Sequence, residues 1–291
     1  MIEDYKKTVE SALNEYFEQY SNSNTIWKAM SYTTLLEGAK RLRAIMCIEI
    51  GKFLGAKIEE LIPCACALEI MHSYSLIHDD LPCMDNDDLR RSKPTNHKVF
   101  GEAIALLAGD ALISLGAQLI IEKTPKSVPI STILDIVLDY SICAGAKGIV
   151  AGQVADIEAE GREIDIKSLE YIHRYKTGAL FKLSILSGAK IAQAKPDIIE
   201  KLAVFADDFG VLFQIYDDII DCTLTTKELG KTANKDEASK KLTYVSAYGL
   251  EKAKNIFYSL IDKNRAILKQ INIESKVFDD IYNKLIKKIG V

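Results

Sequence analysis

The chain has 291 residues, of which 48% are apolar, 37 are Lys or Arg and 41 are Asp or Glu. This apolar content excludes a disordered chain and suffices for one large core or, by length alone, roughly two domains. The net charge of -4 excludes a general attraction to nucleic acid or to an anionic membrane, so any basic site has to be local.

Apolar residues recur at helical spacing almost throughout, and no proline follows Pro196, which favours an all-α chain. In chain order, the pattern predicts helices over 3–19, 30–54, 59–82, 98–121, 128–158, 166–192, 196–223, 235–248, 250–269 and 274–289. The connections are short, and no Gly/Ser-rich linker or internal repeat divides the chain. We therefore expect one helical domain over residues 1–291.

The start of the chain carries Glu3 and Asp4 where a secretory signal would be basic, and no apolar stretch follows. We therefore expect a cytoplasmic protein. The most apolar segment, 103–117, is interrupted by Asp110 and falls short of the ~18 residues that a membrane span needs, so we expect no stable membrane insertion. The six cysteines lack paired CxxC spacing and are expected to be reduced.

The first acidic cluster directly follows the apolar helix that ends near Ile77. It comprises five carboxylates, Asp79, Asp80, Asp85, Asp87 and Asp88. On an unbroken helix, Asp79 and Asp85 would point about 120° apart. Because Pro82 removes a helical donor and ends the helix, the following loop is expected to bring Asp85 back toward Asp79.

The second acidic cluster lies inside a predicted helix and comprises Asp217, Asp218 and Asp221. Asp217 and Asp221 are four residues apart and project from one helical face, about 40° from each other, whereas Asp218 lies to the side. Apolar residues alternate with these aspartates, among them Phe213 and Ile219. This interleaving argues against a simple solvated face.

Carboxylates crowded into partly buried sites need cations. Such hard oxygen ligands suit Mg²⁺ or Mn²⁺, and Mg²⁺ binds through one or two carboxylates together with substrate phosphate oxygens. The clusters thus imply a phosphorylated substrate. Basic residues that suit phosphate accompany them at four places, namely Lys40 and Arg43 after Gly38, Arg90 and Arg91, Lys176, and Lys231.

Taken together, these segments resemble one family, the trans-isoprenyl diphosphate synthases (polyprenyl synthetases) of the short-chain farnesyl and geranylgeranyl type, in particular the bacterial ones. The resemblance rests on the segments 38–43, 68–80, 85–97, 107–112, 152–156, 176–178 and 213–221, which follow the family's order over about residues 38–244. It implies an all-helical bundle around a deep central cavity, a homodimer, and three Mg²⁺ ions, with Mn²⁺ as an alternative, between the two aspartate motifs and a diphosphate.

The resemblance also implies roles for individual residues. Asp79, Asp80, Asp85, Asp217 and Asp221 would bind metal. Lys40, Arg43, His72 and Arg91 would bind isopentenyl diphosphate, and Arg90, Lys176, Thr177, Gln214, Lys231 and Lys241 would face the allylic diphosphate. The groups that act directly in catalysis would be Asp79, Asp80, Asp85, Arg90, Lys176, Thr177, Gln214 and Asp217. His78 is expected to be structural.

The implied reaction is a prenyl transfer, in which isopentenyl diphosphate condenses with dimethylallyl or geranyl diphosphate to give (E,E)-farnesyl diphosphate and inorganic diphosphate. Ionisation of the allylic C–O bond produces a carbocation and a highly charged leaving group, so preorganised charge is expected to supply most of the catalysis. The carbonyl of Thr177 and the side chain of Gln214 would stabilise the carbocation. The cation must also be kept from water.

Product length in this family depends on bulky residues four or five positions before the first aspartate, here Ser75 and Tyr74. Tyr74, with the four-residue spacer between Asp80 and Asp85, predicts a fifteen-carbon product. Two other interpretations stay open, namely that Tyr74 packs elsewhere and that the product is geranylgeranyl diphosphate. The paired motifs disfavour a terpene cyclase, a non-catalytic partner subunit and a divalent-ion-binding interaction protein.

The sequence departs from the family pattern at five positions. Ala39 and Ser92 stand where the family usually has glycine, Leu224 and Thr225 stand where it has Gly-Asp, and Thr232 replaces a common proline. The acidic and basic groups are retained, so we expect activity, whereas the loop after Asp221 is expected to be ordered differently.

Overall fold

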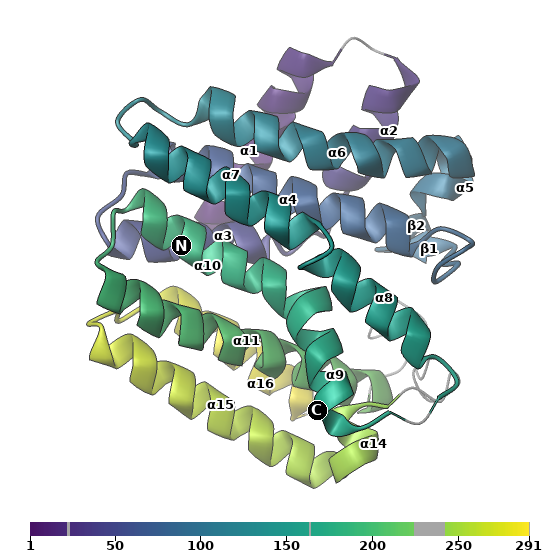
Figure 1. The fold of residues 1–291 in the computed structure, drawn as a ribbon, viewed down its shortest axis with the longest axis vertical. Helices are drawn as coiled ribbons and strands as arrows, with labels where there is room; N and C mark the ends of the chain where they lie inside the picture. Colours follow the sequence, from purple (N-terminus) through teal and green to yellow (C-terminus); the bar gives the residue numbers. More distant parts are fainter. Residues whose placement is uncertain (22–23, 163, 224–241, 291) are drawn as a thin grey trace. The chain divides into compact units, whose positions relative to one another are not determined.

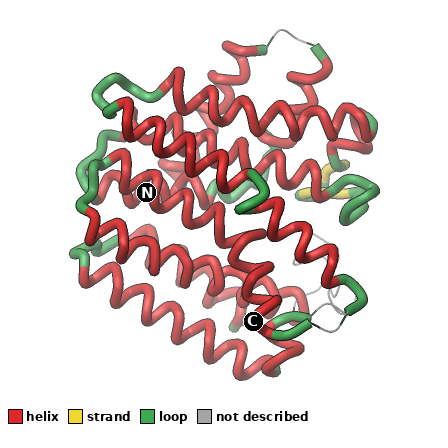
Figure 2. Tube along the Cα trace, viewed as in Figure 1, coloured by secondary structure: helices red, strands yellow, loops and turns green. Residues whose placement is uncertain are grey.

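The computed structural model of the chain describes residues 1–21, 24–162, 164–223 and 242–290. The described part is built from helices, as predicted, with one small antiparallel hairpin formed by β1 (Leu89–Arg90) and β2 (Lys93–Pro94) (Figure 2). The helices are α1 (Ile2–Tyr20), α2 (Thr25–Thr34), α3 (Leu42–Phe53), α4 (Ile58–Asp79), α5 (Asn96–Phe100), α6 (Glu102–Lys123), α7 (Ile130–Ala144), α8 (Ile149–Ala159), α9 (Ile166–Ile172), the π-helix η1 (His173–Gly178), α10 (Ala179–Ile191), α11 (Pro196–Thr223), α14 (Tyr244–Tyr248), α15 (Leu250–Gln270) and α16 (Lys276–Ile289).

The contacts within the chain define two compact units. The first unit comprises Met1–Ser141 and Ser187–Gln193, and the second comprises Ile142–Leu186 and Ala194–Val291. The first acidic cluster and the Gly38–Arg43 segment belong to the first unit. The second acidic cluster and the Lys176 segment belong to the second.

The centre of the first unit is α4, which packs against α3 and α6 (Figure 1). Most of its residues from Leu61 to Ile77 are buried, and a helix that is apolar on all sides is typical of the interior of a helical protein. Because α4 is held on several sides, its C-terminal end at Asp79 is presented from a rigid support.

The second unit is organised around α11, which packs against η1, α15 and α16 (Figure 1). Its core is a set of aromatic rings in edge-to-face contact. The rings of Phe181 and Phe209 are 5.1 Å apart, and those of Phe205 and Phe278 are also 5.1 Å apart. Such pairs add to the free energy of burial and fix α11 along the length that precedes the second acidic cluster.

Within the described residues, four of the predicted helices are interrupted, and the first half of another, 235–248, lies outside the described residues, which contain its last part as α14. The predicted helix 30–54 is broken between α2 and α3, where Gly38 and Arg41 adopt φ of 84° and 53°. The predicted helix 98–121 is broken at Gly101, with φ of 85°, and 128–158 is broken between α7 and α8. The predicted helix 166–192 contains the π-helix η1. Apolar periodicity continues across the breaks, so it cannot reveal the left-handed residues at the first two or the π turns in the last.

The expectation that no apolar segment reaches the length of a membrane span is wrong for α6. This helix has 22 residues and a mean hydropathy of 2.0, and it is long and apolar enough to cross a membrane by those two criteria alone. The buried core helices of soluble proteins meet the same criteria, and 44% of its most apolar window is buried. The six cysteines are free thiols, as expected; four are buried, and the exposed pair, Cys83 and Cys222, lies beside the two acidic clusters.

Candidate active site

The loop after α4 folds back on the helix end. Pro82 lies just beyond the last helical residue, Asp79, and the backbone N–H of Asp85 donates to the carbonyl of Asp79 at 2.8 Å. A second hydrogen bond, from the N–H of Asn86 to the carbonyl of Leu81 at 3.1 Å, closes the same turn. The predicted return of Asp85 toward Asp79 is therefore confirmed for the backbone.

Asp80 differs from its neighbours, because its side chain is buried, with 1% exposed. The guanidinium of Arg90 holds both carboxylate oxygens: its Nε lies 3.1 Å from Oδ1 and 3.3 Å from Oδ2, and its Nη2 also donates to Oδ1. Burial raises the pKa of Asp80, and Arg90 opposes this rise. Both oxygens are thus engaged by Arg90, to which the family resemblance assigns the allylic diphosphate.

Arg90 is placed by the hairpin, in which it pairs with Lys93. The two residues between them, Arg91 and Ser92, have φ of 52° and 61°, which lie in the left-handed region that favours glycine. The departure at Ser92 therefore puts a side chain on strained turn backbone. By contrast, the buried Ala39 is not among the described non-glycine residues with left-handed backbone.

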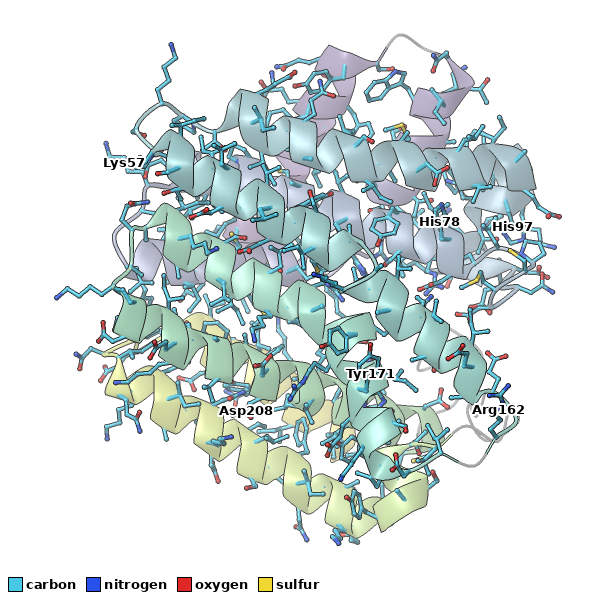
Figure 3. The ribbon with its side chains drawn as sticks, viewed as in Figure 1. Lys57, His78, His97, Arg162, Tyr171 and Asp208 are labelled. Carbon is cyan, nitrogen blue, oxygen red and sulfur yellow. The ribbon has the colours of Figure 1, made fainter. Side chains whose placement is uncertain are left out.

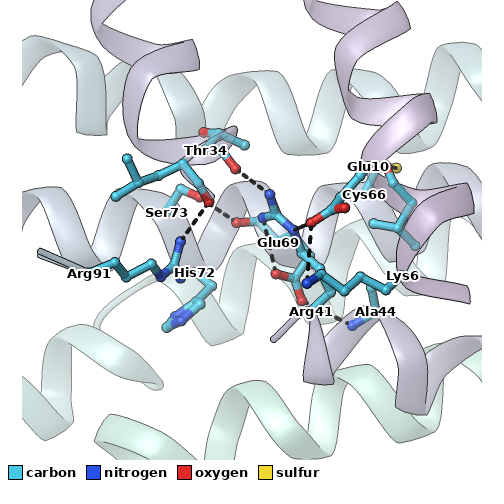
Figure 4. A network of polar contacts seen from close by, with 12 residues as sticks. Lys6, Glu10, Thr34, Arg41, Ala44, Cys66, Glu69, His72, Ser73 and Arg91 are labelled. Carbon is cyan, nitrogen blue, oxygen red and sulfur yellow. Dashed lines mark hydrogen bonds and ion pairs between the residues drawn. The ribbon is translucent and has the colours of Figure 1, made fainter. Parts of the chain in front are cut away.

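Three of the four residues predicted to bind isopentenyl diphosphate are brought together in the first unit. Burial lowers the pKa of His72 well below its usual range, and the positive charges of Arg43 and Arg91 lower it further. Figure 4 shows His72 beside Arg91, whose Nη1 donates to the carbonyl of Leu36 at 3.4 Å. The two guanidinium charges of Arg43 and Arg91 beside His72 would be stabilised by an anion. Lys40, the fourth residue, is exposed.

Tyr74, the predicted determinant of product length, is buried on α4, with 3% exposed. Its ring contacts the ring of His78 edge to face, with centroids 5.8 Å apart. The Nε2 of His78 in turn lies 2.9 Å from the carbonyl oxygen of Leu106 on α6; Figure 3 labels His78 on its helix. The Oγ of Ser75 donates to the carbonyl of His72 at 3.0 Å. His78 therefore joins α4 to α6, in agreement with a structural role.

In the second unit, the π-helix η1 presents Lys176 and Thr177. Single π turns inside α-helices frequently occur at functional sites. The Nζ of Lys176 lies 2.6 Å from Oδ2 of Asp156, which is on α8 and is buried. Asp156 belongs to a segment that carries the family resemblance, but the sequence indicates no role for it.

Thr177, Gln214 and Asp218 form one hydrogen-bonded chain. Thr177 Oγ1 donates to Gln214 Oε1 at 3.2 Å, and Gln214 Nε2 donates to Asp218 Oδ1 at 3.1 Å. The other oxygen of Asp218 accepts from the backbone N–H of Tyr244 at 2.8 Å. The second aspartate of this motif thus connects α11 to the start of α14 and orients Gln214.

Two glycines allow the elements of this unit to approach closely. A Cβ added to Gly152 on α8 would lie 2.1 Å from the backbone nitrogen of Lys176, and one added to Gly210 on α11 would lie 2.7 Å from the Cα of Gly178. Real Cβ contacts are not this short. The position of η1 between α8 and α11 therefore requires the absence of a side chain at both glycines.

In each unit, the remaining carboxylates of the motif suit a metal that is shared with a substrate. Asp79 and Asp217 are half-buried, Asp85 is exposed and Asp221 is buried. Among the residues that the structure describes, no group of three or more His, Cys, Asp or Glu side chains is arranged to hold a metal ion. An all-oxygen donor set of one or two carboxylates per motif fits Mg²⁺, which completes its coordination with phosphate oxygens and water.

Some sequence-predicted residues lie outside the described part of the chain. These are Lys231 and Lys241, together with Leu224, Thr225 and Thr232, at which the sequence departs from the family. Conversely, three residues for which the sequence indicates no role interact with predicted site residues: the charge of Arg41 acts on His72, Asp156 pairs with Lys176, and Asp218 accepts from Gln214. Each has at least one partner far along the chain, namely Glu69 for Arg41, Lys176 for Asp156 and Tyr244 for Asp218, and local spacing carries no signal for those contacts.

Comparison with known proteins identifies the family. The family model described as polyprenyl synthetase matches residues 24–283, which include both units' acidic clusters. A farnesyl diphosphate synthase of Geobacillus stearothermophilus is 44% identical over 253 residues, covering 87% of this chain and 85% of that protein. The large subunit 1 of a heterodimeric chloroplastic geranylgeranyl pyrophosphate synthase of Arabidopsis thaliana is 48% identical over 234 residues, covering 79% of this chain and 62% of that protein.

Solved structures agree with these relatives. The apo crystal structure of an FPP/GFPP synthase from Zymomonas mobilis superposes with a TM-score of 0.84 at 32% identity, covering 99% of this chain and 98% of that one. The similarity of sequence and fold thus extends over nearly all of the chain. The protein is a transferase that belongs to the polyprenyl synthetase family.

Proposed function

We propose that the protein condenses isopentenyl diphosphate with dimethylallyl and then geranyl diphosphate to form (E,E)-farnesyl diphosphate. The observation that carries the proposal is the pairing of two features on α4 and its neighbours. The helix bears His72 among Arg43 and Arg91, and it ends at Asp79, against which Asp85 folds back. The two arginines gathered around His72 suit the diphosphate of one substrate, and the carboxylates at the end of the same rigid helix suit the metal that accompanies the diphosphate of the other.

The proposed roles of the residues follow from the charge of their side chains. Lys40, Arg43, His72 and Arg91 bind the diphosphate of isopentenyl diphosphate, which does not ionise. Asp79, Asp85, Asp217 and Asp221 would hold Mg²⁺, which neutralises the departing diphosphate when bound. Lys176 and Arg90, each already held by an aspartate, provide positively charged groups for the allylic diphosphate.

Thr177 and Gln214 act near the reacting carbon. Their side chains are hydrogen-bonded to each other, and Asp218 fixes the amide of Gln214. Fixed dipoles of this kind stabilise a developing carbocation without having to reorient. We assign Asp80 and Asp218 to positioning, because the oxygens of each already accept hydrogen bonds from within their own unit.

A second candidate function differs only in the length of the product, which would be geranylgeranyl diphosphate. The Arabidopsis relative at 48% identity is named as a geranylgeranyl pyrophosphate synthase subunit, which favours a twenty-carbon product. The Geobacillus relative is named as a farnesyl diphosphate synthase and matches more of both chains. We favour the fifteen-carbon product because Tyr74 places a buried aromatic ring at the family's length-determining position.

We further propose a cytoplasmic homodimer in which residues 1–291 act as one synthetase domain. Large apolar side chains on α6 and α7 support the dimer: Leu106 and Leu107 are 47% and 51% exposed, and Leu134 and Leu138 are each 59% exposed. Exposed apolar residues concentrated on neighbouring elements are typical of interaction surfaces. A match of the family model to residues of both units supports the single domain.

The proposed chemistry is tested by metal dependence and by charge-neutralising variants. Turnover of isopentenyl and dimethylallyl diphosphates should require Mg²⁺ and stop on addition of EDTA. Asp79→Asn and Asp217→Asn should each lower kcat by about 10²-fold or more, whereas Asp262→Asn, at an exposed position on α15, should leave it unchanged. Product formed from an allylic diphosphate without isopentenyl diphosphate would instead indicate a cyclase.

A further inference from the structure

Arg41 occupies an unusual place between two residues that are assigned to substrate. It immediately precedes α3 and has φ of 53° and ψ of 31°, a left-handed conformation that is unfavourable for a residue with a side chain. Lys40 before it is exposed and Arg43 after it is half-buried, but Arg41 is buried, with 3% exposed. A buried arginine on strained backbone requires strong compensating contacts.

The side chain of Arg41 contacts three helices of the first unit (Figure 4). Its Nη2 donates to the carbonyl of Thr34 at the end of α2 at 2.8 Å. Its Nε lies 3.6 Å from Oε1 of Glu10 on α1, and its Nη1 lies 3.5 Å from Oε2 of Glu69 on α4. The guanidinium therefore ties the segment before α3 to α1, α2 and α4 together.

Glu69 completes a closed arrangement. It is buried, with 2% exposed, and its second oxygen, Oε1, accepts from the backbone N–H of Ala44 at 3.2 Å. Ala44 lies in the first turn of α3, where backbone N–H groups lack partners within the helix. Glu69 thus accepts a hydrogen bond from the first turn of α3 and pairs with Arg41, the residue just before α3. Both contacts fix the start of α3.

We infer that Arg41 is a positioning residue for isopentenyl diphosphate: its buried contacts hold the left-handed turn and the start of α3, and thereby aim Lys40 and Arg43 at the substrate. This inference rests on the proposed function for the role of those two residues. Its physical basis is that a misplacement of about 1 Å in a binding group can cost about 10²-fold in rate. Arg41 itself, enclosed by its three partners, does not contact substrate.

The test compares Arg41→Ala and Arg41→Gly with Asn96→Ala. The glycine variant removes the same side chain but relieves the strained backbone. Asn96 is a matched control, because it is also buried in the first unit and also ties to α2, donating to the carbonyl of Ala29 at 2.8 Å. Steady-state kinetics give KM for each substrate, thermal melting gives Tm, and hydrogen exchange reports the protection of the Ala44 amide.

Both Arg41 variants should raise KM for isopentenyl diphosphate by about tenfold or more, with KM for the allylic substrate changed less than about twofold. Arg41→Gly should have a higher Tm than Arg41→Ala but the same raised KM for isopentenyl diphosphate. The rise in KM would then not be a consequence of lowered stability. Asn96→Ala should lower Tm and leave both KM values and the exchange of Ala44 unchanged. If Arg41→Ala fails to fold, Arg41→Gly provides the same comparison.

Three results would overturn the inference. The first is an Arg41 variant with lowered Tm and unchanged KM for isopentenyl diphosphate. The second is an equal rise of both KM values, and the third is the same change in Asn96→Ala. If the unmodified protein shows no turnover of isopentenyl diphosphate, the proposed function fails separately. Exchange at Ala44 then still decides whether Arg41 holds the start of α3: unchanged protection in Arg41→Gly rejects it.

Discussion

Replacing Asp218 with asparagine removes one carboxylate oxygen from a position where both oxygens accept hydrogen bonds. The side chain is buried, with 4% exposed, and its two partners are Gln214 Nε2 and the backbone N–H of Tyr244. Asparagine retains one oxygen and places an NH₂ group in the other position, where it faces a donor. One of the two partners therefore loses its acceptor.

The cost follows from the kind of bond that is lost. A hydrogen bond to a charged group contributes about 1.5–3 kcal/mol to stability, so we expect Asp218→Asn to destabilise the protein by about 2 kcal/mol. Rotation of the Gln214 amide recovers part of this loss, because Thr177 can then accept rather than donate. That rotation also reverses the dipole next to the reacting carbon, so kcat should fall even though no proposed metal ligand has been removed.

The assay compares Asp218→Asn with Asp217→Asn. We expect Asp218→Asn to lower Tm, to reduce kcat by about tenfold through the misoriented amide, and to leave the Mg²⁺ concentration for half-maximal rate unchanged. Asp217→Asn should leave Tm nearly unchanged, lower kcat and raise the Mg²⁺ concentration for half-maximal rate. Equal Tm for the two variants, or a raised Mg²⁺ requirement in Asp218→Asn, would refute the assignment of Asp218 to positioning.

Three further outcomes follow from other parts of the molecule. Tyr74→Ala should yield products beyond fifteen carbons by chromatographic sizing while Tyr74→Phe does not; unchanged lengths in Tyr74→Ala would assign the ring to packing alone. Because the pKa of His72 is lowered in the folded protein, its contribution to stability is present above the unfolded pKa of about 6.5 and is lost as pH falls below it. Tm should therefore fall less steeply between pH 8 and pH 5.5 in His72→Gln than in the unmodified protein, and parallel curves would contradict this. Gly210→Ala should push α11 away from Gly178 at a cost of about 1–3 kcal/mol and lower kcat, whereas Gly290→Ala, with φ of -87° and an added Cβ at an ordinary 3.6 Å from the carbonyl oxygen of Ile286, should leave kcat unchanged; an active, equally stable Gly210→Ala would show that the close approach is not needed.

The sequence predicts most of the helices because apolar spacing at a period of 3.6 is a local property. It also predicts that the first motif turns back on itself, since Pro82 cannot continue the helix, and the hydrogen bond from Asp85 to Asp79 confirms this. The same spacing cannot show where a helix breaks without a proline. The interruptions at Gly101 and before Arg41 depend on left-handed φ values, which tertiary contacts stabilise.

The division of labour within each aspartate motif could not be predicted, because it depends on distant partners. Asp80 and Asp79 are neighbours in an acidic run, yet Asp80 alone is buried against an arginine of the following hairpin. Asp218 is paired with the start of a helix 26 residues further along the chain. The spacing of residues on α11 does place Asp218 on a different face from Asp217. It does not indicate that Asp218 accepts from the backbone N–H of Tyr244.

The most direct test of the account is the length of the product formed by the purified protein from labelled isopentenyl diphosphate and geranyl diphosphate with Mg²⁺. We predict one condensation and a fifteen-carbon diphosphate as the main product, with Tyr74 closing the pocket to a further addition. A main product of twenty carbons would contradict the assignment of farnesyl diphosphate. The absence of any condensation product with either allylic primer would contradict the proposed reaction itself.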